Sequence, residues 1–427
     1  MHTLLASVRY YMSDRIYLGL FRSWTCITRL GHDTLVPEES FSVSAEDFTV
    51  IRRHVRDFVR HVVVPRENDI ANEDRVPDDI RAIAAQMGLF GYALPVEWGG
   101  LGLDLAQDVE LAMEFGYTSL ALRSLFGTNN GIAGQLIVGL GTPTQKATWL
   151  PAMALGEEVA SFALTEEGAG SDPSGLRTSA ERSGEGWVLN GRKRFITNAP
   201  SATVFVTFAR TDAAATGSRG ISAFLVPADS PGLRVGPKDA KMGQEGAWTA
   251  EVIFDQVQLP ESSLVGDAEG TAFSAALTSL ARGRVHIAAL AVGTARRALD
   301  ESVAYASSAT QGGVVIGTHQ LVKAMLADQV TGVMTGEAVV RTAAANYVAG
   351  RDRRIGPSVA KLYCTEMAST VADLAVQVHG GTGYMKGVAV ERIYRDARLL
   401  RLYEGTSEIQ RLIIGGQVIG AASGVAT

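Results

Sequence analysis

The spacing of apolar residues along the chain changes twice. From residue 45 to 158 they recur every three or four positions, which is the period of amphipathic helices. The first stripe consists of Phe48, Ile51, Val55, Phe58 and Val62. Further helices are predicted near 77–88, 104–117, 119–139 and 143–155. The pattern therefore predicts an N-terminal helical domain over residues 45–158.

From residue 159 to 268, short β-branched and aromatic runs bounded by Gly, Pro, Asp and Ser replace the helical spacing. We predict strands over 203–209, 221–226 and 251–259. A further strand over 186–190 is predicted to end in a hairpin turn at Asn190-Gly191, because this dipeptide favours such turns. The middle of the chain is therefore expected to be a β domain, a barrel or a sandwich.

Helical spacing returns after residue 269 and continues toward the end of the chain. Residues 272–308 contain no proline and are predicted to form one helix of roughly 55 Å, at about 1.5 Å per residue. Further helices are expected over 318–349, 356–379 and 406–419. We therefore expect a C-terminal helical bundle over residues 269–427 and an α+β multidomain fold.

Composition and charge narrow the choice of partners. The chain has 427 residues, and its formal net charge of −6 argues against nucleic acid as a main partner. Its two cysteines are too few for a disulfide framework, and its seven scattered histidines give a metal site no support. No apolar run reaches the ~18–20 residues that a membrane span needs. We expect a soluble cytoplasmic protein without a metal.

Residues 1–44 differ from the rest of the chain. Four arginines precede Asp33, with Asp14 as the only acid among them. They are Arg9, Arg15, Arg22 and Arg29. The segment is interpreted as an N-terminal extension, either a disordered lead or a transit peptide that would direct the protein to the mitochondrial matrix. A misassigned start is also compatible, because Met12 could serve as the initiator.

A carboxylate lies just before the last predicted helix. Residues 403–411 read Tyr-Glu-Gly-Thr-Ser-Glu-Ile-Gln-Arg, and the spacing of Ser407 and Gln410 is that of a capping box. The free N–H groups of a helix start suit an anion. Glu404, outside the helix and followed by a glycine, is compatible with a solvated turn residue or with a carboxylate that faces a ligand.

A glycine-rich loop opens the β domain. Residues 161–172 read Ser-Phe-Ala-Leu-Thr-Glu-Glu-Gly-Ala-Gly-Ser-Asp, and small residues of this kind let a backbone approach a flat ligand closely. About thirty residues later the chain reads Arg-Phe-Ile-Thr-Asn at 194–198. Neither the G-x-G-x-x-G spacing of a dinucleotide fold nor a P-loop occurs.

These two segments and the 403–411 stretch together resemble the signatures of the acyl-CoA dehydrogenases. Lys241-Met242-Gly243, the Gly/Pro loop at 94–102 and the run at 254–260 also match, so the resemblance covers about 45–420. It implies a helical domain, a β domain and a four-helix bundle, with bound FAD. It also implies that Glu404 removes the α-proton of a fatty acyl-CoA.

The resemblance assigns further residues. Those implied to bind the flavin ring are Phe162, Leu164, Thr165, Phe195 and Thr197. Gln377 and Gly381 are implied to approach the adenosine half of a flavin bound mainly by a neighbouring subunit, while Thr406 and Glu408 hold its pyrophosphate and adenine region. The residues implied to bind substrate are Ser171, Arg284 and Gly405, with Arg284 beside Glu404.

The chain departs from the family pattern at several positions. Glu167 replaces a proline and Phe195 a tryptophan, which we expect to be tolerated. Ala309 and Gly312 replace an arginine and a phenylalanine, so one contact to the flavin pyrophosphate is missing. Gly283 occupies the helix position that carries the catalytic glutamate in some members, which leaves Glu404 as the only family-type base.

The resemblance predicts α,β-dehydrogenation of an acyl-CoA to trans-2-enoyl-CoA, as in β-oxidation. Electron-transfer flavoprotein is the expected electron acceptor, and the protein is expected to be a homotetramer or a homodimer. Two alternatives remain at this point: an acyl-CoA oxidase on the same fold, and a non-catalytic subunit that has lost turnover.

Overall fold

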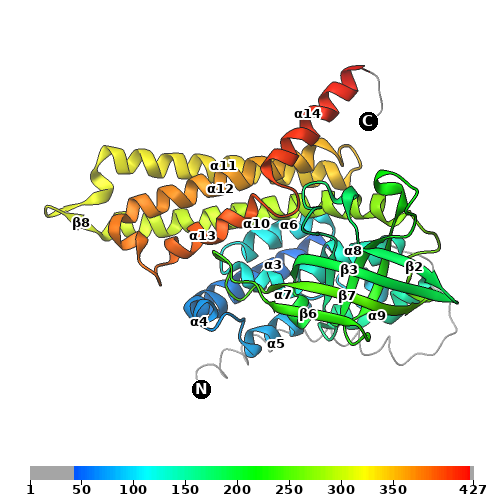
Figure 1. Cartoon of the computed structure of the whole chain (residues 1–427). Helices are drawn as coiled ribbons and strands as arrows, with labels where there is room; N and C mark the ends of the chain where they lie inside the picture. Colours follow the sequence, from blue (N-terminus) through cyan, green and yellow to red (C-terminus); the bar gives the residue numbers. More distant parts are fainter. Residues whose placement is uncertain (1–42, 424–427) are drawn as a thin grey trace. The chain divides into compact units, whose positions relative to one another are not determined.

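The structure, a computed structural model, describes residues 43–423 (Figure 1). The predicted N-terminal extension, residues 1–44, lies outside this range except for Val43 and Ser44. Residues 43–423 all belong to one compact unit, so the predicted domain boundaries near 158 and 268 stay predictions. We therefore speak of an N-terminal block, a β block and a C-terminal bundle.

Seven α-helices form the N-terminal block within residues 45–155. They are α3 (Ala45–Phe58), α4 (Glu67–Glu73), α5 (Asp78–Gln86), α6 (Leu105–Phe115), α7 (Leu120–Asn130), α8 (Ile132–Leu140) and α9 (Pro143–Leu155). Ser44 caps α3, because its side chain accepts a hydrogen bond from the backbone N–H of Asp47. The single helix predicted over 119–139 is wrong: the backbone leaves helical geometry at Gly131, and two helices form.

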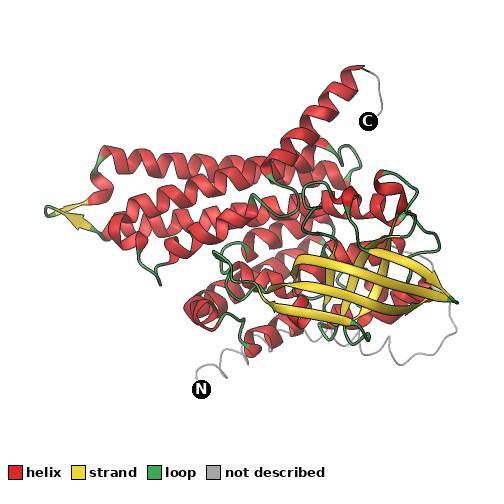
Figure 2. Ribbon diagram, in the orientation of Figure 1, coloured by secondary structure: helices red, strands yellow, loops and turns green. Residues whose placement is uncertain are grey.

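The β block is one curled seven-stranded sheet, drawn as a curved yellow layer in Figure 2. Its strands are β1 (Ala160–Ala163), β2 (Ser179–Ser183), β3 (Gly186–Thr197), β4 (Val204–Arg210), β5 (Ile221–Pro227), β6 (Leu233–Lys238) and β7 (Thr249–Pro260). Their order is β1-β4-β2-β3-β7-β6, with β5 antiparallel to β4 and β1 parallel to it. The ends of β1 and β3 thereby lie on the same sheet.

The predicted hairpin turn at Asn190-Gly191 is wrong. β3 continues through this dipeptide to Thr197, and its register with β7 shifts between Leu189 and Gly191. β7 carries the extra residue of this bulge, and the N–H of Gln256 donates to the side chain of Asn190. The hairpin turn lies instead between Ser183 and Gly186, where Gly184 supplies the left-handed backbone.

The C-terminal bundle confirms the single long helix. Its helices are α10 (Ala272–Ser308), α11 (Gln320–Val348), α12 (Ile355–His379), α13 (Ala389–Leu400) and α14 (Ser407–Ser423). A small hairpin, β8 (Thr310–Gln311) and β9 (Val314–Val315), joins α10 to α11. Helix α6 packs against α10, so the bundle and the N-terminal block share one apolar core. The expected fold class, helical first and last parts around a curled sheet, is confirmed.

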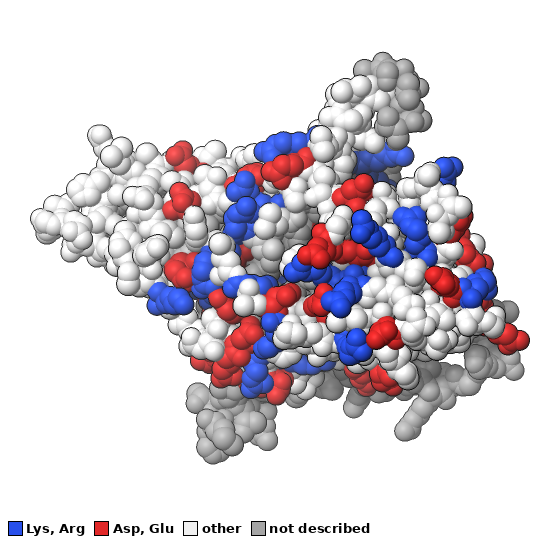
Figure 3. All heavy atoms as spheres, in the orientation of Figure 1, with Lys and Arg blue, Asp and Glu red and all other residues white. Residues whose placement is uncertain are grey.

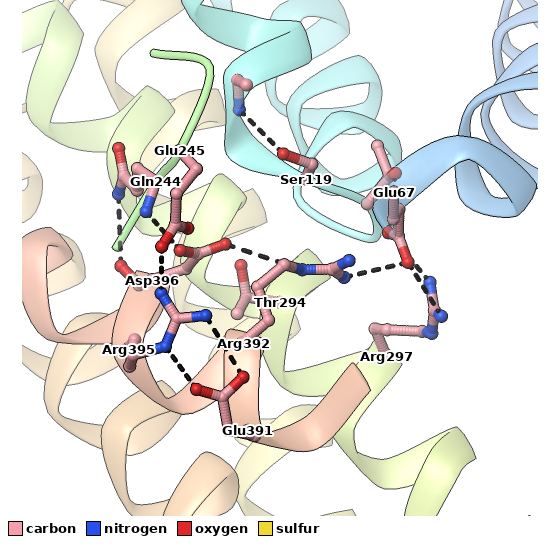
Figure 4. A network of polar contacts seen from close by, with 12 residues as sticks. Glu67, Ser119, Gln244, Glu245, Thr294, Arg297, Glu391, Arg392, Arg395 and Asp396 are labelled. Carbon is pink, nitrogen blue, oxygen red and sulfur yellow. Dashed lines mark hydrogen bonds and ion pairs between the residues drawn. The ribbon is translucent and has the colours of Figure 1, made fainter. Parts of the chain in front are cut away.

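A buried set of charged residues joins all three parts, and we call it the interblock ion network (Figure 4). Glu67 of α4 pairs with Arg297 of α10 at 3.1 Å and with Arg392 of α13 at 2.9 Å. On α13, the carboxylate of Asp396 accepts a hydrogen bond from the backbone N–H of Gln244 in the β block. Burial raises the pKa of Asp396 to about 6, and the opposing effects of Arg392 and of that hydrogen bond are smaller.

Candidate active site

Glu404 lies in the turn between α13 and α14, and its backbone is left-handed with φ 53°, followed by φ 94° at Gly405. Three hydrogen bonds hold this turn. The side chain of Gln410 donates to the carbonyls of Glu404 and Gly405, and Lys361 Nζ donates to the carbonyl of Gly405 at 2.6 Å. The turn therefore fixes where the Glu404 side chain can point.

The capping box predicted from Ser407 and Gln410 is wrong. Helix α14 begins at Ser407, so Thr406 precedes it, and the Thr406 hydroxyl accepts from the backbone N–H of Ile409 at 3.3 Å. The Ser407 hydroxyl is buried and makes no hydrogen bond to any described residue. The side chain of Gln410 instead donates to the backbone of the Glu404 turn. The predicted helix start is therefore confirmed, but the residue that caps it is Thr406 and not Ser407.

The carboxylate of Glu404 is 9% exposed and occupies a gap beside α10. One oxygen, Oε1, lies 3.7 Å from Arg123 Nη2. The other, Oε2, is buried without a hydrogen bond to any described residue, although buried carboxylate oxygens normally have partners. A Cβ added at Gly283 would lie 2.2 Å from Oε2, so Gly283 leaves the space that this carboxylate fills.

Three cationic side chains surround this one carboxylate. Burial lowers the pKa of Arg284, which the charge of Glu404 opposes, and the Arg284 Nε is buried without a hydrogen bond to any described residue. Burial also lowers the pKa of Lys361, to about 8. Together with Arg123 these groups give an excess of two positive charges, so the site favours a ligand that carries or develops negative charge.

Arg123 is not among the site residues predicted from the sequence. Arg123 lies on α7, whereas Arg284 lies on α10 and Lys361 on α12. It is far from Glu404 in the sequence and approaches it only in the folded chain. A signal was present, because Arg123 is the single charged residue in the apolar run of residues 120–126. Because a buried charge needs a partner, a single arginine in an apolar run indicates that an acidic group lies close to it in the fold.

The residues predicted to contact the flavin ring meet at the ends of β1 and β3. The N–H of Arg194 donates to the carbonyl of Thr165 at 2.9 Å, and the hydroxyl of Ser161 donates to the carbonyl of Thr197 at 2.7 Å. Leu164 is buried, and its carbonyl accepts a hydrogen bond from Lys193 Nζ of β3 at 3.2 Å. Phe162 also lies on β1, but its ring packs on Phe208 at 4.9 Å between centroids.

Phe195 presents its ring to the outside, at 61% exposure, with left-handed backbone at φ 58°. The Arg194 guanidinium lies 5.1 Å from the ring centroid. The neighbouring loop holds Gly168 and Gly170, where an added Cβ would meet no atom within 4 Å, and exposed Ser171. An open ring face beside an uncrowded glycine loop suits a flat aromatic ligand.

The structure does not bring the remaining predicted residues to this place within one chain. Gln377 lies at the far end of α12, sixteen residues beyond Lys361, which corresponds to roughly 24 Å of helix. Exposed Gly381 follows it, after His379, whose ring stacks on Tyr305 near the end of α10 at 4.3 Å between centroids. Thr406 and exposed Glu408 lie at the start of α14, where hydrogen bonds from its own backbone N–H and from Thr406 lower the pKa of Glu408.

The family departures at Ala309 and Gly312 belong to the β8–β9 hairpin. Gln311 pairs with Val314, and the two residues between them, Gly312 and Gly313, both have left-handed backbone at φ 56° and 77°. A two-residue turn of this kind requires positive φ at both positions, which is why glycine stands there. The departure is thus part of a regular hairpin.

Residues 43–423 contain neither a candidate membrane span nor a candidate metal site. No helix in this range is long and apolar enough to cross a membrane. No group of three His, Cys, Asp or Glu side chains in the same range is arranged to hold a metal ion.

Known proteins resemble this chain along almost its whole length. Residues 45–157, 161–257 and 270–419 match the N-terminal, middle and C-terminal domains of acyl-CoA dehydrogenases. An acyl-CoA dehydrogenase of Bacillus subtilis is 37% identical over 375 residues, covering 88% of this chain and 98% of that protein. The CarC subunit of the caffeyl-CoA reductase-Etf complex of Acetobacterium woodii is 35% identical, covering 88% and 99%.

A solved structure agrees with these matches. Glutaryl-CoA dehydrogenase from Mycobacterium smegmatis superimposes with a TM-score of 0.82 at 33% identity, covering 90% of this chain and 96% of that one. The order of the blocks, helical first and last parts around a curled sheet, therefore agrees with the three matched domains. The chain belongs to the acyl-CoA dehydrogenase family, whose members are FAD-dependent oxidoreductases that act on acyl-CoA.

Proposed function

We propose that this enzyme oxidises the Cα–Cβ bond of an acyl-CoA thioester to a trans-2-enoyl-CoA, with Glu404 as the base that takes the α-proton. The carrying observation is the Glu404 carboxylate, which is nearly buried, surrounded by cations and left with a free oxygen, Oε2. A base that must reach a carbon acid needs such an unengaged oxygen. FAD, when bound, supplies the acceptor for the hydride that leaves Cβ.

The backbone around Glu404 supports this role. The N–H of Glu404 donates to no group among residues 43–423, and the left-handed turn holds it in place. A fixed, unpaired donor suits the thioester oxygen, where negative charge develops as the α-proton leaves. Arg284 and Lys361 add positive charge beside the same turn, and Gly405 keeps the turn open by its positive φ.

The residues for FAD fit the group on geometric grounds. We propose that Leu164, Thr165, Phe195 and Thr197, with Phe162 behind them on β1, hold the ring, because an exposed aromatic face lies there beside uncrowded glycines. Ser171, on the same loop, would contact the flavin or the CoA chain. Since Gln377 and Gly381 lie far along the bundle, they would serve a flavin held mainly by a neighbouring copy. Thr406 and Glu408, at a helix start, would hold its pyrophosphate and adenine region.

The deciding experiment is an anaerobic titration of the purified flavoprotein with a panel of acyl-CoAs of increasing chain length, following loss of the oxidised-flavin absorbance. At least one acyl-CoA should bleach the flavin in the wild type, and Glu404→Gln should abolish this bleaching while retaining flavin. Peroxide released in air on substrate addition would identify an oxidase instead. Absence of bleaching with every acyl-CoA in a flavin-loaded protein would indicate a non-catalytic subunit.

A carboxylated acyl group is a second candidate substrate class, favoured by Arg123. A guanidinium is costly to bury beside a purely hydrocarbon chain, and here one lies 3.7 Å from the base and is 12% exposed. The M. smegmatis neighbour is named a glutaryl-CoA dehydrogenase. The panel should therefore include glutaryl-CoA and valeryl-CoA, which have the same chain length. Preference for valeryl-CoA would remove this candidate.

Two kinds of partner are proposed, an electron acceptor and further copies of this chain. We propose electron-transfer flavoprotein as the electron acceptor, because one relative is a subunit of a complex named with Etf. We also propose a homotetramer or homodimer. Acidic and basic side chains intermix over most of the face in Figure 3, but the β8 end of the bundle is mostly uncharged.

A groove of about 490 Å³ between α11, α12 and α14 supports assembly with a second copy of this chain. Leu362, Met367 and Ile414 are among its lining residues. Large apolar side chains stay exposed on the same three helices, among them Leu321, Met334 and Leu412. Sedimentation of the flavin-loaded protein tests the assembly.

We also propose a role in fatty-acid β-oxidation in the cytoplasm. This proposal rests on the class of reaction and on the bacterial origin of relatives such as the Bacillus subtilis protein.

A further inference from the structure

A line of buried polar side chains leads from the protein interior to the proposed base. The Tyr92 hydroxyl donates to Asp108 Oδ1 at 3.0 Å, and Asp108 Oδ1 lies 2.9 Å from His286 Nδ1. The other ring nitrogen, His286 Nε2, lies 3.0 Å from Arg123 Nε. Arg123 Nη2 in turn lies 3.7 Å from Glu404 Oε1. These residues come from separate elements, α6, α7, α10 and two turns.

The chemistry of arginine fixes the tautomer of His286. A guanidinium N–H can only donate, so His286 Nε2 must accept with its lone pair. Nδ1 then carries the proton, and the Nδ1–H donates a hydrogen bond to the Asp108 carboxylate. Burial would raise the pKa of Asp108, but its contacts with His286, Arg282 and Tyr92 outweigh burial and lower the pKa to about 2. Asp108 is therefore an anion that holds neutral His286 in one orientation.

We propose that His286, oriented by Asp108, is a positioning residue that holds Arg123 against Glu404, and that Arg123 thereby fixes the orientation of the base. The proposal rests on the proposed function in one respect, that Glu404 is the base. It adds that the base is controlled by a line of contacts from α6 through α10 to α7.

Among the three cations beside Glu404, Arg123 differs from Arg284 and Lys361 in the contacts of its side chain. Arg284, on α10, has an unpaired Nε, and Lys361, on α12, is hydrogen-bonded to the carbonyl of Gly405. Arg123 alone among the three is held from behind by a second side chain. Arg282 faces Asp108 at 3.2 Å, and Tyr403, whose pKa burial raises to about 12, stays neutral beside Arg123 and Glu404.

The contact between His286 and Arg123 depends on the lone pair of His286 Nε2, because the Arg123 N–H can only donate. A side chain without an acceptor at this position would leave Arg123 free to move away from Glu404. The rate of proton abstraction should then fall, because the carboxylate would lose the contact that orients it.

The first test measures flavin reduction by the best acyl-CoA, anaerobically and by stopped flow, across the pH range. His286→Leu removes the acceptor at nearly constant volume and should slow reduction by about tenfold to hundredfold, with KM little changed. His286→Gln should restore the rate, because an amide can accept from Arg123 and donate to Asp108.

Arg123→Met should reproduce the His286→Leu profile, and the double variant should be no slower than Arg123→Met alone. Arg296→Met is the matched control, because Arg296 pairs with Glu337 at 2.6 Å in the bundle and should leave the profile unchanged. Additive losses in the double variant, or a normal rate of flavin reduction in His286→Leu, would overturn the proposal.

A second test does not depend on turnover. In protein labelled with ¹⁵N-histidine, the His286 signals, identified by their loss in His286→Gln, should show Nδ1 protonated and Nε2 bare at neutral pH. Arg123→Met should change this pattern or broaden it. A protonated Nε2 in the wild type would overturn the proposal even if Glu404 proves to be the base. If no acyl-CoA reduces the flavin, the proposed function fails while this measurement still reports on the line of contacts.

Discussion

Gly283→Ala should separate the chemistry from the stability of this enzyme. The added Cβ would lie 2.2 Å from Glu404 Oε2, whereas ordinary van der Waals contacts of a Cβ lie at 3.4–4 Å. The carboxylate must therefore move by about 1 Å, and a misplacement of ~1 Å in a reacting group costs on the order of 10²-fold in rate. Flavin reduction at saturating acyl-CoA should fall by about that factor.

The same substitution should not damage the fold. Gly283 lies inside α10, and the atom that must give way is the end of a flexible side chain. Alanine in a helix interior is favoured over glycine by ~1 kcal/mol, so the melting temperature should stay or rise. Gly139→Ala is the control, because Gly139 is helical, exposed and meets nothing within 4 Å. A slow variant that melts early, or a stable variant of normal rate, would refute this reasoning.

The position also allows the base to be moved. The double variant Gly283→Glu with Glu404→Gly removes the carboxylate that the new side chain would meet, and it replaces a left-handed glutamate at φ 53° by glycine. It should recover part of the rate lost in Glu404→Gly, with an altered preference for acyl-chain length. An inactive double variant that still binds flavin and acyl-CoA would show that α10 cannot present a base here.

The other predictions concern the base, the cofactor and the pH dependence of stability. Glu404→Gln should lower the rate of flavin reduction by ~10⁴-fold or more without loss of flavin, as measured by stopped flow and absorbance. Ala309→Arg should slow flavin loss on dialysis by an amount equivalent to ~1.5–3 kcal/mol, and unchanged loss in an intact oligomer would mean another residue serves the pyrophosphate. The pKa of Asp396 is about 6 when folded against an ordinary 3.8, so the folded chain holds a proton that the unfolded chain releases. Stability contributed by this group is present below about pH 4 and is lost as pH rises to about 6, by up to about 3 kcal/mol, and urea unfolding of Asp396→Asn should lack that decline.

Local periodicity was sufficient for the long elements. The proline-free stretch 272–308 formed one helix, since every turn of it could bury part of its apolar face. Short-range signals that depend on backbone geometry were less informative. Asn190-Gly191 has the composition of a hairpin turn, yet pairing of β3 with β7 on both sides of it carried the strand through. Gly131 broke a helix whose apolar pattern continued past it.

The candidate site was predictable where its residues belong to a contiguous motif. Glu404 was predicted from such a motif and Arg284 from the family resemblance, and in the structure the charge of Glu404 acts on Arg284. Arg123, His286 and Asp108 were missed because each lies in a different segment and only the fold places them in line. Gln377 and Gly381 remain untested, since one chain alone places them far from Glu404.

The interblock ion network has a consequence for biosynthesis. Glu67 emerges from the ribosome early, but its partners Arg297 and Arg392 are made 230 and 325 residues later. At ~5–20 residues per second, the complete set forms only roughly 15–65 s after Glu67 has appeared. Until then α4 would have to bury an unpaired carboxylate, so it should stay undocked. Ribosome-bound chains arrested before Arg392 should accordingly be cleaved by a protease near Glu67 faster than released chains. The time needed to synthesise Arg392 would then limit when α4 docks and the enzyme becomes compact.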